Sequence, residues 1–165
     1  MKLLLHTCCG PCSIYPLRVL REAGAQVMGF FYRGNIHPFS EGEKRLRTLQ
    51  TYAAQIDLQL IVQKAYDLED FLRQAAYREK DRCRFCYYDR LKAAALIARK
   101  GRLDAFSSTL LYSKFQNHDL IRSIGEAVAV ETGVDFYYQD YRVGWKEGVE
   151  RSRQLGMYRQ PYCGC

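Results

Sequence analysis

The sequence predicts an α/β protein built on a doubly wound parallel sheet. Five short, mostly apolar segments are spaced along the chain, helical patterns lie between them, and no repeat or low-complexity linker interrupts the alternation. Because a helix follows each strand, right-handed crossovers leave the strands parallel and covered on both faces. In such a sheet a ligand binds beyond the carboxyl ends of the strands, near the point where the strand order reverses.

The predicted strands are rich in apolar residues, as expected for strands that are buried on both faces. The first reads KLLLH and the second QVMGFFY. We expect strands at 2–6, 26–32, 58–62, 105–111 and 135–138.

The predicted helices are marked by signals at their ends. Pro11 opens the first helix and Gly24 follows its end. Ser40 with Glu43 predicts a capping box for the second helix, and Asn117 is expected to cap the fourth. We expect helices at 11–23, 40–56, 83–100, 120–132 and 146–156.

The length and composition predict one domain, 1–165, that folds around a core of its own. The chain has 165 residues, of which 48% are hydrophobic. The few leucines before His6 are too short a run for a secretory signal, and no apolar stretch approaches the ~18 residues of a membrane span. We therefore expect a cytoplasmic protein with no membrane partner. Thiols stay reduced in that compartment, so clustered cysteines favour metal binding or catalysis over structural disulfides.

The charge of the chain favours an anionic partner such as RNA. Lysine and arginine number 25 against 18 aspartate and glutamate residues, giving a net charge of +7. Aromatic residues lie among the basic clusters at 44–47, 78–90 and 151–159, and arginine beside stackable rings suits unpaired RNA bases. A solvated basic surface with tyrosines packed on the core explains the same pattern.

All seven cysteines fall into three clusters. The first cluster, Cys8, Cys9 and Cys12, occupies the loop after the first strand and the start of the first helix. The second, Cys83 and Cys86, is spaced i, i+3 at a helix start, where both sulfurs lie on one side and the thiolate is favoured. The third is Cys163-Gly164-Cys165. The clusters predict a metal–thiolate or redox centre at the mouth of the sheet.

Two cysteine pairs supply four thiolates, the number that holds a [4Fe–4S] cluster. We assign Cys8, Cys9, Cys83 and Cys86 to this cluster. The remaining three either bind a second metal together or leave the terminal pair to form a redox-active disulfide: Cys12, Cys163 and Cys165. Zinc accepts thiolates as iron–sulfur clusters do, so the residues alone leave the metal open.

Polar side chains that follow the predicted strands are candidates for substrate contacts. Each also has an ordinary structural interpretation, as a core histidine, a turn or cap residue, or half of an ion pair. His6 ends the first strand beside the thiols. The candidate substrate-binding residues are Asn35, His37, Ser113, Gln116 and Arg142.

Four motifs together resemble one family, the epoxyqueuosine reductases of the QueH type. They are His6-Thr7-Cys8-Cys9-Gly10-Pro11-Cys12, Asn35-Ile36-His37-Pro38, Arg82-Cys83-x-x-Cys86-Tyr87-x-x-Arg90, and the ending Tyr158-Arg159-Gln160-Pro161-Tyr162-Cys163-Gly164-Cys165. The resemblance runs from residue 6 to the C-terminus and shows no departure from the cysteine pattern. It implies a fold like that of the adenine-nucleotide alpha hydrolases (HUP-like). Residues 8–13 replace the ATP-binding loop of those proteins, so no ATP chemistry is expected.

The resemblance also implies an activity. The family reduces the epoxide of epoxyqueuosine to give queuosine at the anticodon wobble position of the tRNAs for Asp, Asn, His and Tyr. It implies a [4Fe–4S] cluster on Cys8, Cys9, Cys83 and Cys86, and a redox role for the terminal cysteine pair. The electron donor is not identified by the sequence.

Epoxide removal takes two electrons and two protons, and this requirement suggests roles for the remaining residues. The dithiol of Cys163 and Cys165 supplies two electrons on oxidation to a disulfide. Alternatively, a second, mononuclear iron held by these residues with Cys12 polarises the epoxide oxygen. His6 is a candidate proton source. The competing hypotheses are a tRNA sulfur-transfer enzyme, which requires an ATP loop, and a zinc-stabilised RNA-binding module.

Overall fold

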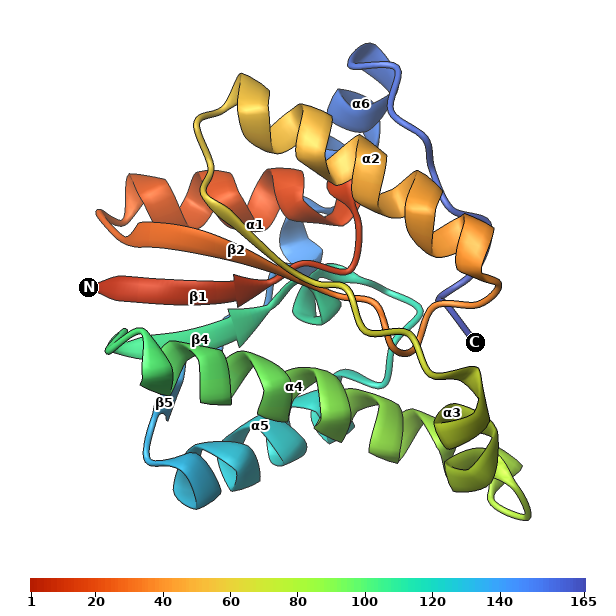
Figure 1. The fold of residues 1–165 in the computed structure, drawn as a ribbon. Coiled ribbons are helices and arrows are strands. Elements are labelled where there is room, and N and C mark those ends of the chain that lie inside the picture. Colours follow the sequence, from red (N-terminus) through yellow and green to blue (C-terminus); the bar gives the residue numbers. More distant parts are fainter.

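The protein folds around one parallel sheet, as the computed structural model of residues 1–165 shows (Figure 1). The strand order is β3-β2-β1-β4-β5. All four neighbouring strand pairs are parallel, which confirms the doubly wound prediction. The strands are β1 (Lys2–His6), β2 (Gln26–Tyr32), β3 (Leu60–Gln63), β4 (Ala105–Ser108) and β5 (Asp135–Phe136).

Helices cover both faces of this sheet. In Figure 1, α1, α2 and α6 lie above the strands, and α4 and α5 lie below them. The six α-helices are α1 (Gly10–Glu22), α2 (Phe39–Gln55), α3 (Leu68–Ala75), α4 (Arg82–Lys100), α5 (His118–Thr132) and α6 (Trp145–Gln154). Three 3₁₀ turns are η1 (Glu79–Asp81), η2 (Thr109–Tyr112) and η3 (Arg142–Gly144). No helix combines the length and apolar character that a membrane crossing needs.

The central strand β1 is buried on both faces. Leu3, Leu4 and Leu5 are fully inaccessible, because helices cover the sheet above and below and successive side chains alternate between the two faces. β1 pairs with β2 on one side and with β4 on the other. The strand order reverses between β1 and β4, so the loops that follow these two strands meet at the position where ligands bind in such sheets.

The helix ends agree with the sequence signals in part. Asn117 caps α5, since its side chain accepts a hydrogen bond from the Leu120 amide at 3.1 Å. The predicted capping box is wrong: α2 begins at Phe39, which places Ser40 inside the helix, and Glu43 forms an ion pair with Arg33. The strand expected at 105–111 ends at residue 108, where the chain turns into η2.

Helix α3 has no counterpart in the sequence prediction. It spans eight residues, and its N-terminus is capped by Asp67, whose carboxylate accepts from the Asp70 amide at 2.9 Å. None of its residues is buried. A helix this short gives too few turns for a clear apolar period, which explains why it was missed.

Candidate thiolate active site

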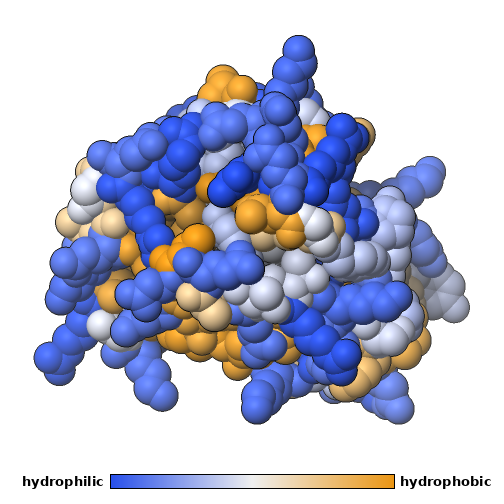
Figure 2. Space-filling view, turned by 90° about the horizontal axis from the view of Figure 1, so that it is seen from above, coloured by the Kyte–Doolittle hydropathy of each residue, from blue (hydrophilic) through white to orange (hydrophobic).

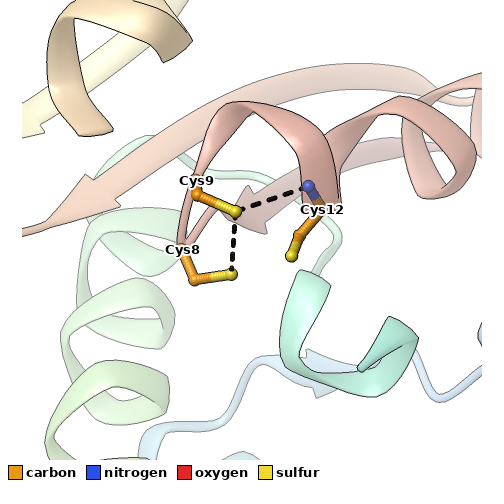
Figure 3. A group of neighbouring side chains, drawn as sticks. All are labelled: Cys8, Cys9 and Cys12. Atoms are coloured by element: carbon orange, nitrogen blue, oxygen red, sulfur yellow. Dashed lines mark hydrogen bonds between the residues drawn. The ribbon is translucent and has the colours of Figure 1, made fainter. Parts of the chain in front are cut away.

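The loop after β1 gathers three thiols at the start of α1 (Figure 3). Cys9 is the N-cap residue, and its sulfur accepts from the Cys12 amide at 3.4 Å. The sulfur atoms of Cys8 and Cys9 lie 3.8 Å apart, and those of Cys8, Cys9 and Cys12 all lie within 4.8 Å of one another. The extended backbone at Cys9, followed by the first helical turn, therefore brings Cys9 and Cys12 together beside Cys8.

The three thiols do not titrate alike. Hydrogen bonds from the Cys12 and Cys9 thiols, helped by the Thr109 hydroxyl 3.3 Å away, hold the pKa of Cys8 well below its usual value. Burial raises the pKa of Cys9, and the hydrogen bond to Cys8 raises that of Cys12. Of the three thiols, Cys8 is therefore the one whose surroundings favour the thiolate.

The second pair of cysteines lies at the start of α4. Cys86 is buried and Cys83 is exposed. Burial raises the pKa of both thiols. Asn35 joins this helix start to the segment after β2, since its side chain donates to the Cys86 carbonyl at 3.1 Å.

The C-terminal segment, residues 158–165, returns to the same edge of the sheet, where Figure 1 places the C-terminus beyond the ends of the strands. Two side-chain nitrogens of Arg45 on α2 donate to the carbonyls of Tyr162 and Cys163, at 2.8 and 2.6 Å. The His37 amide donates to the Gly164 carbonyl at 2.8 Å. A Cβ at Gly164 would lie 2.8 Å from the Asn35 carbonyl, so the close approach requires glycine here.

The three cysteine clusters converge on Arg90 of α4. Burial opposes the charge of this guanidinium, but interaction with the thiols of Cys86, Cys163 and Cys8 outweighs burial and raises its pKa. The terminal thiols also act on the pKa values of Cys83 and Cys86. The structure therefore brings the N-terminal, middle and C-terminal thiols to one region. It groups Cys12 with Cys8 and Cys9, whereas the sequence hypothesis assigned Cys12 to the terminal pair.

A cavity of about 350 Å³ opens beside these thiols. Cys8, Cys12 and Cys163 line one side of it. Its other walls are mainly aromatic and polar, and include Tyr112, Phe115, Trp145, Tyr162, Arg159 and Gln160. The volume and the mixture of aromatic walls with a few polar groups are typical of a small-molecule site.

Gln160 joins the cavity to the thiols. Its side-chain nitrogen donates to the Cys9 sulfur at 2.8 Å and lies 3.7 Å from the Cys12 sulfur. Sulfur is a weak acceptor when protonated and a stronger one as thiolate. The C-terminal segment therefore contacts the N-terminal triad directly as well as carrying its own cysteines.

His6 is fully buried beside the thiols. Its Nδ1 lies 2.8 Å from the Ser108 hydroxyl, and its Nε2 has no partner. Burial, with a contribution from the charge of Arg90, lowers the pKa of His6 to about 3. The imidazole is therefore neutral at physiological pH and does not carry the additional proton of an imidazolium.

The predicted substrate-binding residues divide into two groups. Ser113 and Gln116 line the cavity, and Gln116 also accepts a hydrogen bond from Tyr87 at 2.7 Å. Asn35 and His37 do not line it and instead hold α4 and the C-terminal segment. Arg142 also lies outside the cavity and pairs with Asp140 at 2.6 Å.

Several residues of the site were not predicted. Trp145 is the only tryptophan of the chain, a signal that could have drawn attention to it. Arg45 follows Glu41 by four residues, and Arg90 follows Cys86 by four, the spacing of neighbours on a helix face. The aromatic cavity walls come from η2 and the loop after it, from α6 and from the C-terminal segment, and no sequence pattern joins these parts of the chain.

The donor set fits a metal–thiolate group. Cysteine sulfur is the ligand that iron–sulfur clusters and zinc take, and the arginine buried among the thiols has two nitrogens without a hydrogen-bond partner. A buried cation without a carboxylate is compensated when an anionic metal–thiolate centre lies beside it. The sulfur atoms of Cys8, Cys9 and Cys12 are close enough together to hold a metal.

The fold defines the general class of the protein. It resembles a crystal structure described as a predicted subunit of a tRNA methyltransferase from Methanocaldococcus jannaschii, with a TM-score of 0.61, 12% identity, and coverage of 93% of this chain and 74% of that one. At this identity the likeness concerns the fold alone. The chain is an α/β protein with a doubly wound parallel sheet, as predicted, and it carries thiols where the loop after β1 leaves the sheet.

Sequence comparison then identifies the family. The family model described as "Epoxyqueuosine reductase QueH" matches residues 3–165. A protein of that name from Dehalococcoides mccartyi is 36% identical over 164 residues, which cover 99% of this chain and 90% of that protein. Another, from Thermotoga maritima, is 36% identical over 172 residues, covering 98% and 87%. The chain belongs to the epoxyqueuosine reductase QueH family and is an oxidoreductase, which confirms the resemblance.

Proposed function

We propose that the protein reduces the epoxide of epoxyqueuosine to the alkene of queuosine in the anticodon loop of tRNA. Membership of the QueH family supports the reaction. The observation that carries the proposal is the cavity, in which thiols from the first and third clusters meet aromatic walls. A base displaced from a single-stranded loop can stack on such walls while its substituent reaches the sulfurs.

We propose that Cys8, Cys9, Cys83 and Cys86 hold a [4Fe–4S] cluster. The group, when bound, supplies electrons singly at a potential set by its surroundings. Its four ligands would come from the loop after β1 and the start of α4, and hydrogen bonds of Asn35 and Arg90 join α4 to the segment after β2. The orphaned nitrogens of Arg90 support an anionic occupant.

The terminal cysteine pair can supply two electrons at once, whereas the iron–sulfur cluster passes them singly. Oxidation of the Cys163 and Cys165 thiols to a disulfide releases two electrons and two protons, which convert the epoxide to an alkene and carry its oxygen away as water. Cys163 lines the cavity, and Arg45 fixes the backbone at this residue. An electron donor must then reduce the disulfide. The alternative use of the pair, with Cys12, is to hold a second iron.

The substrate proposal extends to the tRNA backbone. Figure 2 shows the face of the molecule above the sheet, where hydrophilic side chains project around smaller apolar areas. The exposed basic residues of α2 and α6 include Lys44, Arg47, Arg151 and Arg153, and Arg159 lines the cavity. Positive charge beside the cavity suits phosphate contacts that position an anticodon loop. The substrates proposed are the tRNAs for Asp, Asn, His and Tyr.

The test is anaerobic purification, metal and sulfide analysis, and turnover of epoxyqueuosine-containing tRNA. We expect iron with acid-labile sulfide and conversion to queuosine. Colourless protein with stoichiometric zinc and no turnover would contradict the proposal and favour the zinc-stabilised RNA-binding module.

Substitution of the terminal pair tests its role. We expect Cys163→Ser to abolish turnover and to keep the visible absorption of the cluster. Val130→Ser, which places the same side chain on an exposed part of α5, should keep full turnover. Loss of the cluster spectrum in the cysteine variant would overturn the ligand assignment. If Cys165→Ser loses additional iron while the cluster spectrum remains, the pair holds a second metal and is not a free dithiol.

A further inference from the structure

Arg90 is an arginine buried without a counter-charge. It lies on α4, and only 1% of its surface is exposed. No carboxylate pairs with it: Nη2 donates to the Asn35 carbonyl at 3.4 Å, while Nε and Nη1 have no partner. Buried arginines are normally paired, because removing the charge from water is costly unless an anion and further hydrogen bonds compensate it.

Ionisable thiols from all three cysteine clusters lie close to this guanidinium. Cys86 precedes it by one helical turn, and the thiols of Cys86, Cys163 and Cys8, when ionised, raise its pKa against the effect of burial. The C-terminal segment passes directly over it, since a Cβ at Gly164 would lie 3.2 Å from Nη2. Arg90 therefore faces all three cysteine-bearing segments at once.

The other buried arginines of this region have different partners. Arg45 pairs with Glu41 at 2.8 Å, and Arg33 pairs with Glu43 at 2.6 Å. Each of these carboxylates neutralises its arginine locally. Of these three arginines, only Arg90 has no carboxylate partner, so its charge can act on the thiols. This indicates a role beyond joining α4 to the segment after β2.

We infer that Arg90 is a positioning residue of the redox centre, whose charge stabilises the metal–thiolate group and stabilises its reduced form more than its oxidised form. This rests on the proposed function, because it supposes a one-electron iron–sulfur centre on these thiols. Reduction of that centre by an external one-electron reductant adds one negative charge. A fixed cation in a low-dielectric region favours the more negative state.

The experiment is a redox titration of the full-length chain with its cluster assembled anaerobically, using dithionite and mediators and following visible absorption and electron paramagnetic resonance. We expect Arg90→Gln to raise the ratio of oxidised to reduced cluster at least tenfold at a fixed potential, a shift of ~59 mV for a one-electron couple. Arg122→Gln is the matched control, because it removes the same charge from an exposed ion pair on α5. Its ratio should stay within threefold of the unmodified chain.

Arg90→Lys tests whether the positive charge of Arg90, and not only its packing, sets the potential of the cluster. It retains a cation without the planar guanidinium, so its potential should stay closer to that of the unmodified chain than the potential of Arg90→Gln does. It also serves as the measured variant if Arg90→Gln does not fold; a tenfold shift in the lysine variant would then overturn the role of charge. If the cluster of Arg90→Gln has the same reduction potential as the cluster of the unmodified chain, the inference is wrong and the proposed function still stands. Absence of any iron–sulfur cluster in the unmodified chain overturns the proposed function itself.

Discussion

Replacement of Arg45 by methionine is the sharpest test of how the terminal cysteines are held. Arg45 is 1% exposed, pairs with Glu41 at 2.8 Å, and donates to the carbonyls of Tyr162 and Cys163. Tyr158 donates to the other carboxylate oxygen of Glu41 at 2.7 Å. Burial opposes the charge of Glu41, but the hydrogen bonds from Tyr158 and Arg45 outweigh it and lower the pKa of this carboxyl group. One ion pair therefore joins α2 to both ends of the C-terminal segment.

The expected cost follows from the charge left behind. Methionine fills a similar volume but leaves Glu41 buried without its cation, and breaking a buried pair in this way costs about 3–5 kcal/mol. Arg45→Met should therefore reduce the free energy of unfolding by that amount. The double variant Glu41→Gln/Arg45→Met removes both charges, so it should be more stable than Arg45→Met by ~2 kcal/mol or more. Both variants release the two carbonyls that the arginine holds.

The assay combines stability with accessibility of the terminal thiols. Urea unfolding by circular dichroism, under anaerobic conditions and with equal iron content, gives the free energies. Alkylation of Cys163, followed by mass spectrometry, should be faster in both variants, because the docked backbone is released even where stability is recovered. The reasoning is refuted if Arg45→Met lies within ~1 kcal/mol of the unmodified chain, or if Cys163 reacts at an unchanged rate in the double variant.

Two further predictions concern a histidine and a glycine. Burial lowers the pKa of His118, so its imidazole binds a proton less tightly in the folded chain than in the unfolded chain. Stability should therefore fall as pH drops below the unfolded pKa of about 6.5, and His118→Gln should reduce this loss. The groups that face the imidazole are Tyr138, Asp140, Arg142, Asp119 and Arg122. If the free energy of urea unfolding changes with pH equally in His118→Gln and the unmodified chain, the prediction is wrong. A Cβ at Gly148 would overlap the Tyr112 hydroxyl inside the cavity, so Gly148→Ala should lower kcat/KM for epoxyqueuosine-containing tRNA about tenfold, or ~1.4 kcal/mol, without changing iron content. Gly101→Ala, at the exposed end of α4, is its control, and equal kcat/KM in the two variants would remove the cavity from the proposed substrate site.

The sequence was sufficient for features that depend on local pattern. The alternation of apolar strands with amphipathic helices predicted the parallel sheet, because burial on both faces requires such strands. Asn117 was recognised as a cap since its side chain satisfies an amide only three residues away. The spacing of the cysteines, together with the motifs around them, was enough to indicate the family.

The shape of the site depended on contacts between distant segments. Arg45 reaches Cys163 and Gln160 reaches Cys9 only after the C-terminal segment folds back over the mouth of the sheet. No periodicity records such contacts, since local pattern carries information only over a few helical turns or one strand. The chain by itself therefore specified the elements and the thiols at their ends. The tertiary structure decided which thiols meet, which arginine is left to face them, and which aromatic side chains enclose the cavity. These features depend on packing among β1, α2, α4, η2, α6 and the last eight residues.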